Sequence, residues 1–276
     1  MQSRILMLLG AAVFIMTVST SALAGDLDGF KGEKGEIKVA GGTAHIPVMK
    51  EAARRVMGVS PDIQISIAGG GSGVGIKQAG EGLVDIGNSG KKPNDDEISR
   101  YGLHLFQWAI DGVAIIVNPA NKVRALTKQQ VKDIYAGKIQ NWKEVGGVDK
   151  QINLYTRDEA SGTREVFWNQ ALQKGEIAAT ANFSVSNGAM KAAISQDPFA
   201  IGYVSVGHID ESVGAVAFDG VAPSRQTVKD GSYPIARGLY SCTKGAPVGL
   251  TKKFIDYLFT VEGQQIVTEQ GFIAVQ

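Results

Sequence analysis

The sequence predicts an α/β fold in which two lobes enclose a ligand cleft. Strand-like and helix-like segments alternate from Ile37 onward, which is typical of α/β proteins. After a predicted leader, about 250 residues remain, enough for two lobes with a core each. The 35 glycines among 276 residues are nearly twice the usual share and suit many tight turns between strands and helices.

The first two predicted strands each lead into a helix through a glycine-rich turn. Residues 36–40 and 63–67 alternate as strands, and a helix is predicted over 47–57, where Pro47 suits the first helical position. Thr43 and Ser72 lie in the two turns, so a small hydroxyl residue stands near the start of each helix. Turns of this kind let the backbone approach a ligand closely.

The remaining elements follow the same alternation. The apolar run over 111–117 indicates a buried central strand, and Thr127 with Gln130 forms a capping box that begins a helix ending at Tyr135. Apolar residues over 250–269 recur at helical spacing and predict a helix pair packed on the first lobe. Further elements are expected as strands over 152–156, 201–204 and 213–218 and as a short helix over 190–194.

Two segments are predicted to cross between the lobes, residues 112–117 and 233–240. Two crossings make a hinge, and the cleft beside it is a common location for a small ligand. Lobe 1 is then discontinuous and consists of residues 25–116 and 233–276, while lobe 2 consists of residues 117–232.

Residues 1–24 predict a cleaved signal peptide. Arg4 provides the positively charged N-terminal region, residues 5–18 form the apolar region, and an A-x-A cleavage pattern ends at Ala24. Later apolar runs are too short to span a membrane, and no cysteine near the cleavage point could accept a lipid. Cys242 is the only cysteine, which excludes an intramolecular disulfide. We therefore expect an exported, periplasmic protein without lipid anchor or direct membrane insertion.

The charge balance excludes some partners. Removal of residues 1–24 takes away Arg4 alone among the charged residues, so 28 − 1 = 27 basic side chains remain against 27 acidic ones. A net charge of zero argues against nucleic acid or an anionic membrane surface, because both need a basic face. With no net charge to attract it, an anion would have to be bound by a local cluster of donor groups.

The strongest local signal is Arg157-x3-Ser161-Gly162-Thr163, directly before an apolar-periodic run. The free N–H groups of a first helical turn, two hydroxyls and a guanidinium converge in this pattern. Such a cluster favours a tetrahedral oxyanion. The alternative interpretation is an ordinary serine cap beside a surface arginine.

The sequence does not match the common enzyme motifs. The glycine block over 69–75 does not fit Gly-x-Gly-x-x-Gly, and Gln78 stands where a P-loop needs serine or threonine. His45, His104 and His208 lie far apart, without metal-ligand spacing. We expect no metal, no cofactor and no enzymatic activity. A phosphoester hydrolase and a structural envelope protein remain as minor alternatives.

Taken together, the motifs resemble the substrate-binding protein of the bacterial high-affinity phosphate ABC transporter over residues 37–272. The segments that carry the resemblance are Gly-Gly-Thr43, Gly-Gly-Gly-Ser72-Gly, Val84–Ser89, the Arg157 motif, Asn187-Gly-x5-Ile194, Ala200–Val204 and Tyr233-Pro-Ile. The resemblance implies a two-lobed type II periplasmic binding protein fold with phosphate between the lobes. It also implies an ABC permease as membrane partner, and we expect a monomer.

Carried over residue by residue, the resemblance implies a set of phosphate-binding groups that donate hydrogen bonds: Thr43, Ala44, Ser72, Arg157, Ser161, Gly162 and Thr163. Glu159 falls where the family often has an acidic residue that holds the arginine. We therefore expect Glu159 to orient Arg157.

One position departs from the family pattern. Family members often have an aspartate after Asn88-Ser89 that accepts the proton of hydrogen phosphate, and this chain has Gly90. The hydroxyl of Ser89 or a backbone carbonyl is expected to accept the proton instead, so Ser89 and Gly90 complete the expected site. Without the carboxylate, rejection of sulfate is expected to be weaker, because like-charge repulsion is missing. A binding protein for sulfate, molybdate or tungstate is therefore the alternative function.

Overall fold

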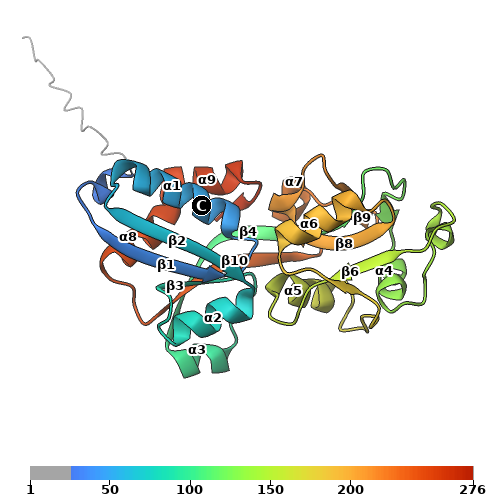
Figure 1. Cartoon of the computed structure of the whole chain (residues 1–276), viewed down its shortest axis with the longest axis horizontal. Coiled ribbons are helices and arrows are strands. Elements are labelled where there is room, and N and C mark those ends of the chain that lie inside the picture. Colours follow the sequence, from blue (N-terminus) through green and yellow to red (C-terminus); the bar gives the residue numbers. More distant parts are fainter. Residues whose placement is uncertain (1–25, 276) are drawn as a thin grey trace, which may run out of the picture.

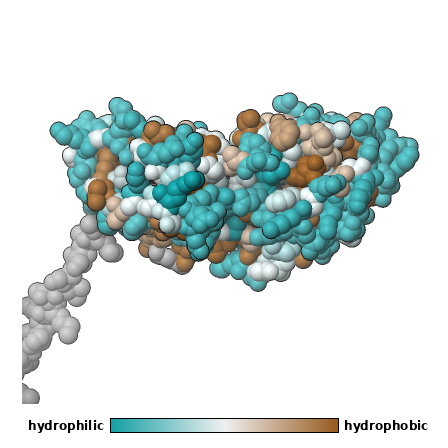
Figure 2. Space-filling model, turned by 90° about the horizontal axis from the view of Figure 1, so that it is seen from below, coloured by the Kyte–Doolittle hydropathy of each residue, from teal (hydrophilic) through white to brown (hydrophobic). Residues whose placement is uncertain are grey.

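A computed structural model describes residues 26–275, so the predicted signal peptide lies outside the described residues. The chain forms an α/β fold of two lobes joined by two long strands (Figure 1). The space-filling view shows a mostly hydrophilic face with a notch between the two halves (Figure 2). Within residues 26–275, no helix combines the length and apolarity that a membrane span requires.

The elements of the first lobe come from both ends of the chain. The N-terminal part contributes η1 (Asp28–Phe30), β1 (Gly35–Gly41), α1 (Ile46–Val59), β2 (Ile63–Gly70), α2 (Ser72–Gly80), β3 (Ile86–Ser89) and α3 (Asp95–Tyr101). The C-terminal part contributes β10 (Ala236–Lys244), α8 (Gly249–Leu258), α9 (Val261–Glu269) and β11 (Ile273–Ala274). The predicted C-terminal helix pair is thus confirmed.

The middle of the chain forms the second lobe. Strand β4 (Leu103–Val117) leads into it from the first lobe, and β5 (Ala125–Leu126), α4 (Lys128–Tyr135), η2 (Trp142–Val145), β6 (Asn153–Thr156) and α5 (Gly162–Gln170) follow. It continues with β7 (Asn182–Phe183), α6 (Asn187–Gln196), β8 (Ala200–Ser205), η3 (Val206–His208), β9 (Gly214–Phe218) and α7 (Arg225–Lys229).

Strand β4 connects the two halves of the sheet, whose order is β2-β1-β3-β10-β4-β8-β6-β7. Residues Leu103–Gly112 of β4 pair antiparallel with β10, and residues Val113–Val117 pair antiparallel with β8. The sheet therefore changes partners between Gly112 and Val113. A Cβ at Gly112 would lie 2.6 Å from Val228 Cγ2, so only glycine fits this close packing.

Each half has its own hydrophobic core. One core gathers apolar side chains of β1, α1, β2, α8 and α9, with Trp108 of β4. The other gathers side chains of α4, α5, β6, β8 and β9, with Val113, Ile115 and Val117 of β4. Because both cores draw on β4, this strand holds the two lobes in one molecule.

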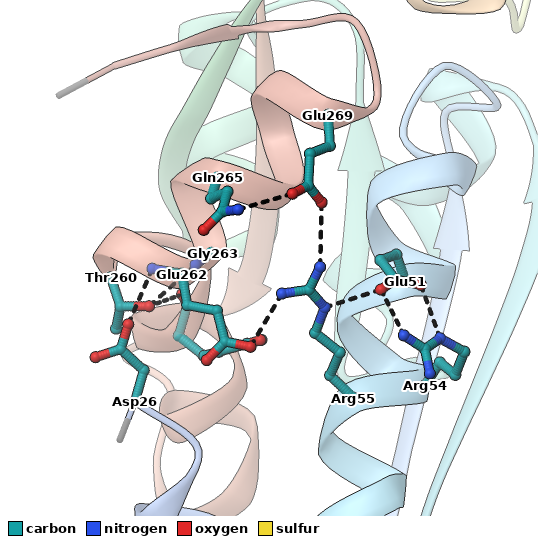
Figure 3. A network of polar contacts seen from close by, with 10 residues as sticks. Asp26, Glu51, Arg54, Arg55, Thr260, Glu262, Gly263, Gln265 and Glu269 are labelled. Atoms are coloured by element: carbon teal, nitrogen blue, oxygen red, sulfur yellow. Dashed lines mark hydrogen bonds and ion pairs between the residues drawn. The ribbon is translucent and has the colours of Figure 1, made fainter. Parts of the chain in front are cut away.

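A charged network joins α1 to α9 (Figure 3). Arg55 donates from Nε to Glu51 at 2.8 Å, from Nη1 to Glu262 at 3.1 Å and from Nη2 to Glu269 at 3.1 Å. Hydrogen bonds from Arg54 and Arg55 lower the pKa of Glu51 to about 2. The network fastens the C-terminal helix of the discontinuous lobe to its N-terminal helix.

Candidate functional site

A small pocket lies where the starts of α1, α2 and α5 meet the end of β3 and the start of β10. Its walls are formed by Gly42, Thr43, Ala44, His45, Gly71, Ser72, Gly90, Arg157, Ser161, Gly162, Thr163 and Arg237. It contains about 180 Å³ of empty space, part of it open to solvent, and polar or charged side chains and glycines form most of its wall. The pocket therefore suits a small ion. All the predicted site residues line it except Ser89 and Glu159.

Helix α5 begins at the pocket wall as the Ser161-Gly162-Thr163 pattern predicts. Ser161 Oγ caps the helix by accepting the N–H of Arg164 at 3.2 Å. The N–H groups of Gly162 and Thr163 belong to the first turn, which has no intrahelical acceptor. A Cβ at position 162 would lie 2.1 Å from Ser72 Oγ, so glycine is needed for α5 to meet the start of α2.

Arg157 is buried, with 1% of its surface exposed, and it forms no salt bridge among residues 26–275; the charge of Asp158 acts favourably on it without pairing. Nη2 donates to Val185 O at 3.2 Å, and the backbone N–H donates to Tyr203 Oη at 3.1 Å. Nε and Nη1 have no hydrogen-bond partner. Burial lowers the pKa of Arg157, because the charged form has lost its water. An anion in the pocket supplies both the missing charge and the missing acceptors.

The prediction that Glu159 orients Arg157 is wrong. Glu159 is exposed, and none of the guanidinium's hydrogen bonds goes to it. The chain turns between Asp158 and Ser161, where Ser161 N donates to Asp158 O at 3.2 Å, and Glu159 lies on the solvent side of this turn. The carbonyl of Val185 and the hydroxyl of Tyr203 hold Arg157 instead.

Arg237 of β10 is a site residue that the sequence analysis missed. It faces Asp111, its cross-strand neighbour on β4, to which Nε donates at 2.9 Å. Nη2 lies 2.7 Å from the same carboxylate oxygen, without the alignment of a hydrogen bond. Nη1 donates to Thr163 Oγ1 at 3.0 Å and, weakly, to Gly90 O at 3.4 Å. The pocket thus contains a second cation, and this one has a carboxylate behind it.

Ser89 does not line the pocket, and its role as a proton acceptor stays a prediction. Its hydroxyl donates to Lys91 O at 2.6 Å and accepts from Lys91 N at 3.3 Å, which closes a local turn. Gly90 does line the pocket, and its N–H donates to Ser72 Oγ at 2.9 Å. A Cβ at Gly90 would lie 2.7 Å from Arg237 Nη1, so the guanidinium takes the space that a side chain would need.

The pocket hydroxyls are arranged as donors. Thr43 Oγ1 accepts from both N and Nδ2 of Asn187, at 3.2 and 3.0 Å, and Thr163 Oγ1 accepts from Arg237. Ser72 Oγ accepts from Gly90, as described above. A hydroxyl has one hydrogen and two lone pairs, so an oxygen that accepts from the protein keeps its hydrogen for another partner. Asn187, which the motif search noted only as part of the resemblance, sets this orientation for Thr43.

Two histidines beside the pocket add no positive charge at neutral pH. Burial, with the charge of Arg237, lowers the pKa of His45 to about 3. Burial, with the charge of Lys191, lowers the pKa of His208 to about 4. Residues 26–275 contain no cluster of His, Cys, Asp and Glu side chains that could hold a metal ion. The chemistry of the pocket is therefore hydrogen-bond donation from a positive wall.

Comparisons with known proteins agree with this geometry. A family model described as a PBP superfamily domain matches residues 29–262. The phosphate-binding protein PstS of Bacillus subtilis (strain 168) is 38% identical over 285 residues, covering 99% of this chain and 95% of that protein. PstS of Borreliella burgdorferi is 28% identical and covers 87% of this chain and 90% of that protein.

A solved structure with bound phosphate is also similar. It is a phosphate ABC transporter substrate-binding protein from Clostridium perfringens, with a TM-score of 0.82, 35% identity, and coverage of 88% of this chain and 100% of that one. A phosphate transport receptor from Vibrio cholerae follows with a TM-score of 0.69, 32% identity, and coverage of 87% and 100%. The chain therefore belongs to the PBP superfamily and, within it, to the family of phosphate-binding proteins named PstS.

Proposed function

We propose that this protein binds inorganic phosphate in the pocket between its lobes and delivers it to the membrane permease of an ABC transporter. The observation that carries the proposal is Arg157, a buried guanidinium with two unpartnered nitrogen atoms among hydroxyl and N–H donors. An unpaired buried charge is costly, so its retention in a folded protein points to a partner that arrives from solution. The relatives named above are phosphate-binding proteins of this type.

The ligand set in this proposal is Thr43, Ala44, Ser72, Gly90, Arg157, Ser161, Gly162 and Thr163, the predicted residues that line the pocket. Each charge-assisted hydrogen bond contributes roughly 1.5–3 kcal/mol, and several together offset the loss of the ion's hydration shell. Association carries large costs of its own, so these contributions do not add up to the affinity.

The proposed ligand lies between lobes of residues 25–116 with 233–276 and residues 117–232. Direct contacts already cross between them: Gly73 N donates to Ala160 O at 3.0 Å, and Lys91 Nζ lies 3.0 Å from Glu165. Binding in this arrangement holds the lobes together and opening releases the ion, which is how such a protein passes its cargo to a permease. In this proposal the protein acts as a periplasmic monomer without enzymatic activity or lipid anchor.

Isothermal titration tests the proposal. The purified chain without its leader is unfolded, dialysed free of bound phosphate and refolded, and is then titrated with phosphate. We expect saturable binding of one ion per chain that is at least about 30-fold weaker in Arg157→Met. Arg54→Gln, which removes an exposed arginine far from the pocket, is the matched control. A parent protein that takes up no phosphate while its circular dichroism is native contradicts the proposal.

A further inference from the structure

One salt bridge crosses from the first lobe to the second. Lys91 Nζ, on the segment between β3 and α3, lies 3.0 Å from Glu165 Oε2, in the first turn of α5. Every other salt bridge formed within residues 26–275 stays inside one lobe. The side chain of Lys91 is 20% exposed and that of Glu165 38%, so the pair is partly shielded from water. A contact of this kind depends on how far the lobes have closed.

Both ends of this salt bridge are fixed directly beside the pocket. The hydroxyl of Ser89 donates to Lys91 O and accepts from Lys91 N, and Gly90, which lies between them, lines the pocket. On the other lobe, Glu165 N donates to Ser161 O at 3.0 Å, and Ser161 lines the pocket as well. The salt bridge therefore spans the cleft one residue from the pocket on one side and one helical turn from it on the other.

Glu97 of α3 holds Lys91 within reach of the cleft. Glu97 Oε1 lies 3.7 Å from Lys91 Nζ, and Glu97 Oε2 accepts Asn94 N at 2.9 Å as part of a capping box. Glu97 and Lys91 belong to the same lobe, so this contact does not require closure. Exposed salt bridges are weak partly because two long side chains lose their freedom. Lys91, already held by Glu97, loses less when Glu165 approaches.

The charges around the cleft connect this salt bridge with a bound anion. Glu165 alone would repel an anion in the pocket, and Lys91 neutralises it. A closed but empty cleft also buries Arg157 with Nε and Nη1 unpartnered. Burying an unpaired charge costs more than a partly exposed salt bridge contributes. The salt bridge is therefore too weak to close an empty cleft, and it adds to closure once an anion balances Arg157.

We propose that Lys91 and Glu165 form a latch that closes over bound phosphate and lengthens the time for which it is held. The inference rests on the proposed function and concerns the rate of release. The salt bridge breaks each time the lobes open, so it stabilises the closed, loaded form relative to the open form from which phosphate leaves. Both residues act by positioning the lobes, since neither lines the pocket.

Release of labelled phosphate tests the latch. Protein freed of phosphate by unfolding and refolding is loaded with radiolabelled inorganic phosphate, mixed rapidly with excess unlabelled phosphate and sampled by rapid filtration. We expect release to be about two- to fivefold faster in Lys91→Met and in Glu165→Gln than in the parent, as suits a partly exposed salt bridge. The difference should shrink between about 0.01 M and about 1 M sodium chloride, because salt screens such pairs.

Glu165→Gln separates a latch from a simple effect of charge on the ligand. As a charge alone, Glu165 repels the anion, so its removal would slow release. As one half of the latch, its removal speeds release. Glu159→Gln, which removes another exposed carboxylate just before α5, is the matched control. Lys92→Met is the control for Lys91→Met, because Lys92 is its exposed neighbour and is absent from the salt bridge. Both controls should release phosphate at close to the parent rate.

The double variant Lys91→Met with Glu165→Gln completes the test. It should release phosphate no faster than the single variants, because one broken contact cannot be lost twice. Thermal melting without ligand verifies that each variant folds. Unchanged or slower release in Glu165→Gln overturns the latch, and so do fully additive effects in the double variant. A parent protein that takes up no phosphate overturns the proposed function instead.

Discussion

Two buried arginines meet at the pocket and differ in how their charges are balanced. Arg237, on a strand that joins the lobes, has Asp111 within 2.7 Å. Arg157, on the loop between β6 and α5, has only a carbonyl oxygen as partner for its guanidinium. One charge is therefore neutralised by the fold and the other is left for the ligand. The difference separates an arginine that supports the folded state from one whose stabilising partner is absent until the ligand binds.

The largest expected effect concerns the unbalanced arginine. Replacing Arg157 by methionine removes the charge that has no salt-bridge partner, so phosphate affinity should fall by roughly 2–5 kcal/mol, about 30-fold to several-thousand-fold in Kd. The melting temperature without ligand should be equal to or above that of the parent, because a desolvated charge is gone. Titration calorimetry and thermal melting measure the two effects. A large loss of stability without ligand would show that other protein groups already stabilise the charge of Arg157 in the folded state.

The balanced arginine should behave in the opposite way. Arg237→Met leaves the carboxylate of Asp111 buried and unpaired, which should cost roughly 3–5 kcal/mol of unfolding free energy. Adding Asp111→Asn removes the stranded charge and should restore most of that loss. Urea denaturation of the single and double variants, both without ligand, measures the difference. Equal stabilities would mean that Asp111 is held by Ser205 and not by Arg237.

Loss of the neutral hydrogen-bond donor Asn187 is expected to reduce phosphate affinity less than loss of a charged donor. Asn187 donates a hydrogen bond to the hydroxyl of Thr43, as Arg237 does to that of Thr163, and both donors orient the hydroxyl that accepts. Asn187 is neutral, whereas Arg237 is charged. Asn187→Ala should therefore weaken phosphate binding by about 0.5–1.5 kcal/mol, roughly tenfold or less. Asn182→Ala, at the exposed strand β7, is the control and should leave Kd unchanged. A loss as large as that of Arg157→Met would mean that charge is not what distinguishes these donors.

The last prediction concerns the two buried histidines beside the arginines. Burial lowers the pKa of His45 to about 3 and that of His208 to about 4, and the charge of Arg237 contributes to both shifts. Below the ordinary pKa of 6.5 the unfolded chain binds protons that the native state refuses, so stability is complete above pH 6.5 and falls as pH drops toward 4. One such group gives a slope of at most about 1.4 kcal/mol per pH unit.

Urea denaturation at several pH values tests this last prediction. His208→Gln should flatten the acid side of the stability curve relative to the parent protein. Identical curves for the parent and the variant would show that His208 titrates normally in the native state.

Elements with local signals were predicted correctly. The capping box of Thr127 and Gln130 is present, with Thr127 N donating to Gln130 Oε1 at 2.8 Å, and α4 ends at Tyr135 as expected. Ser161 caps α5 in the same local way. Helix α3 was missed because none of its residues is buried, so it has no apolar periodicity. The Asn94–Glu97 capping box was the signal that could have revealed it.

The sequence by itself determined where three turns place their hydroxyl and N–H donors, because caps and strand–helix turns depend on residues only a few positions apart. Only the tertiary structure decided that Arg237 forms a salt bridge and that Arg157 does not. Arg237 finds Asp111 across 126 positions and Thr163 across 74, through strand register and lobe packing. The adjacent Glu159 turns to solvent while the carbonyl of Val185, 28 positions away, reaches Arg157. Neutralisation of a charge depends on distance in space, and a motif gives only distance along the chain.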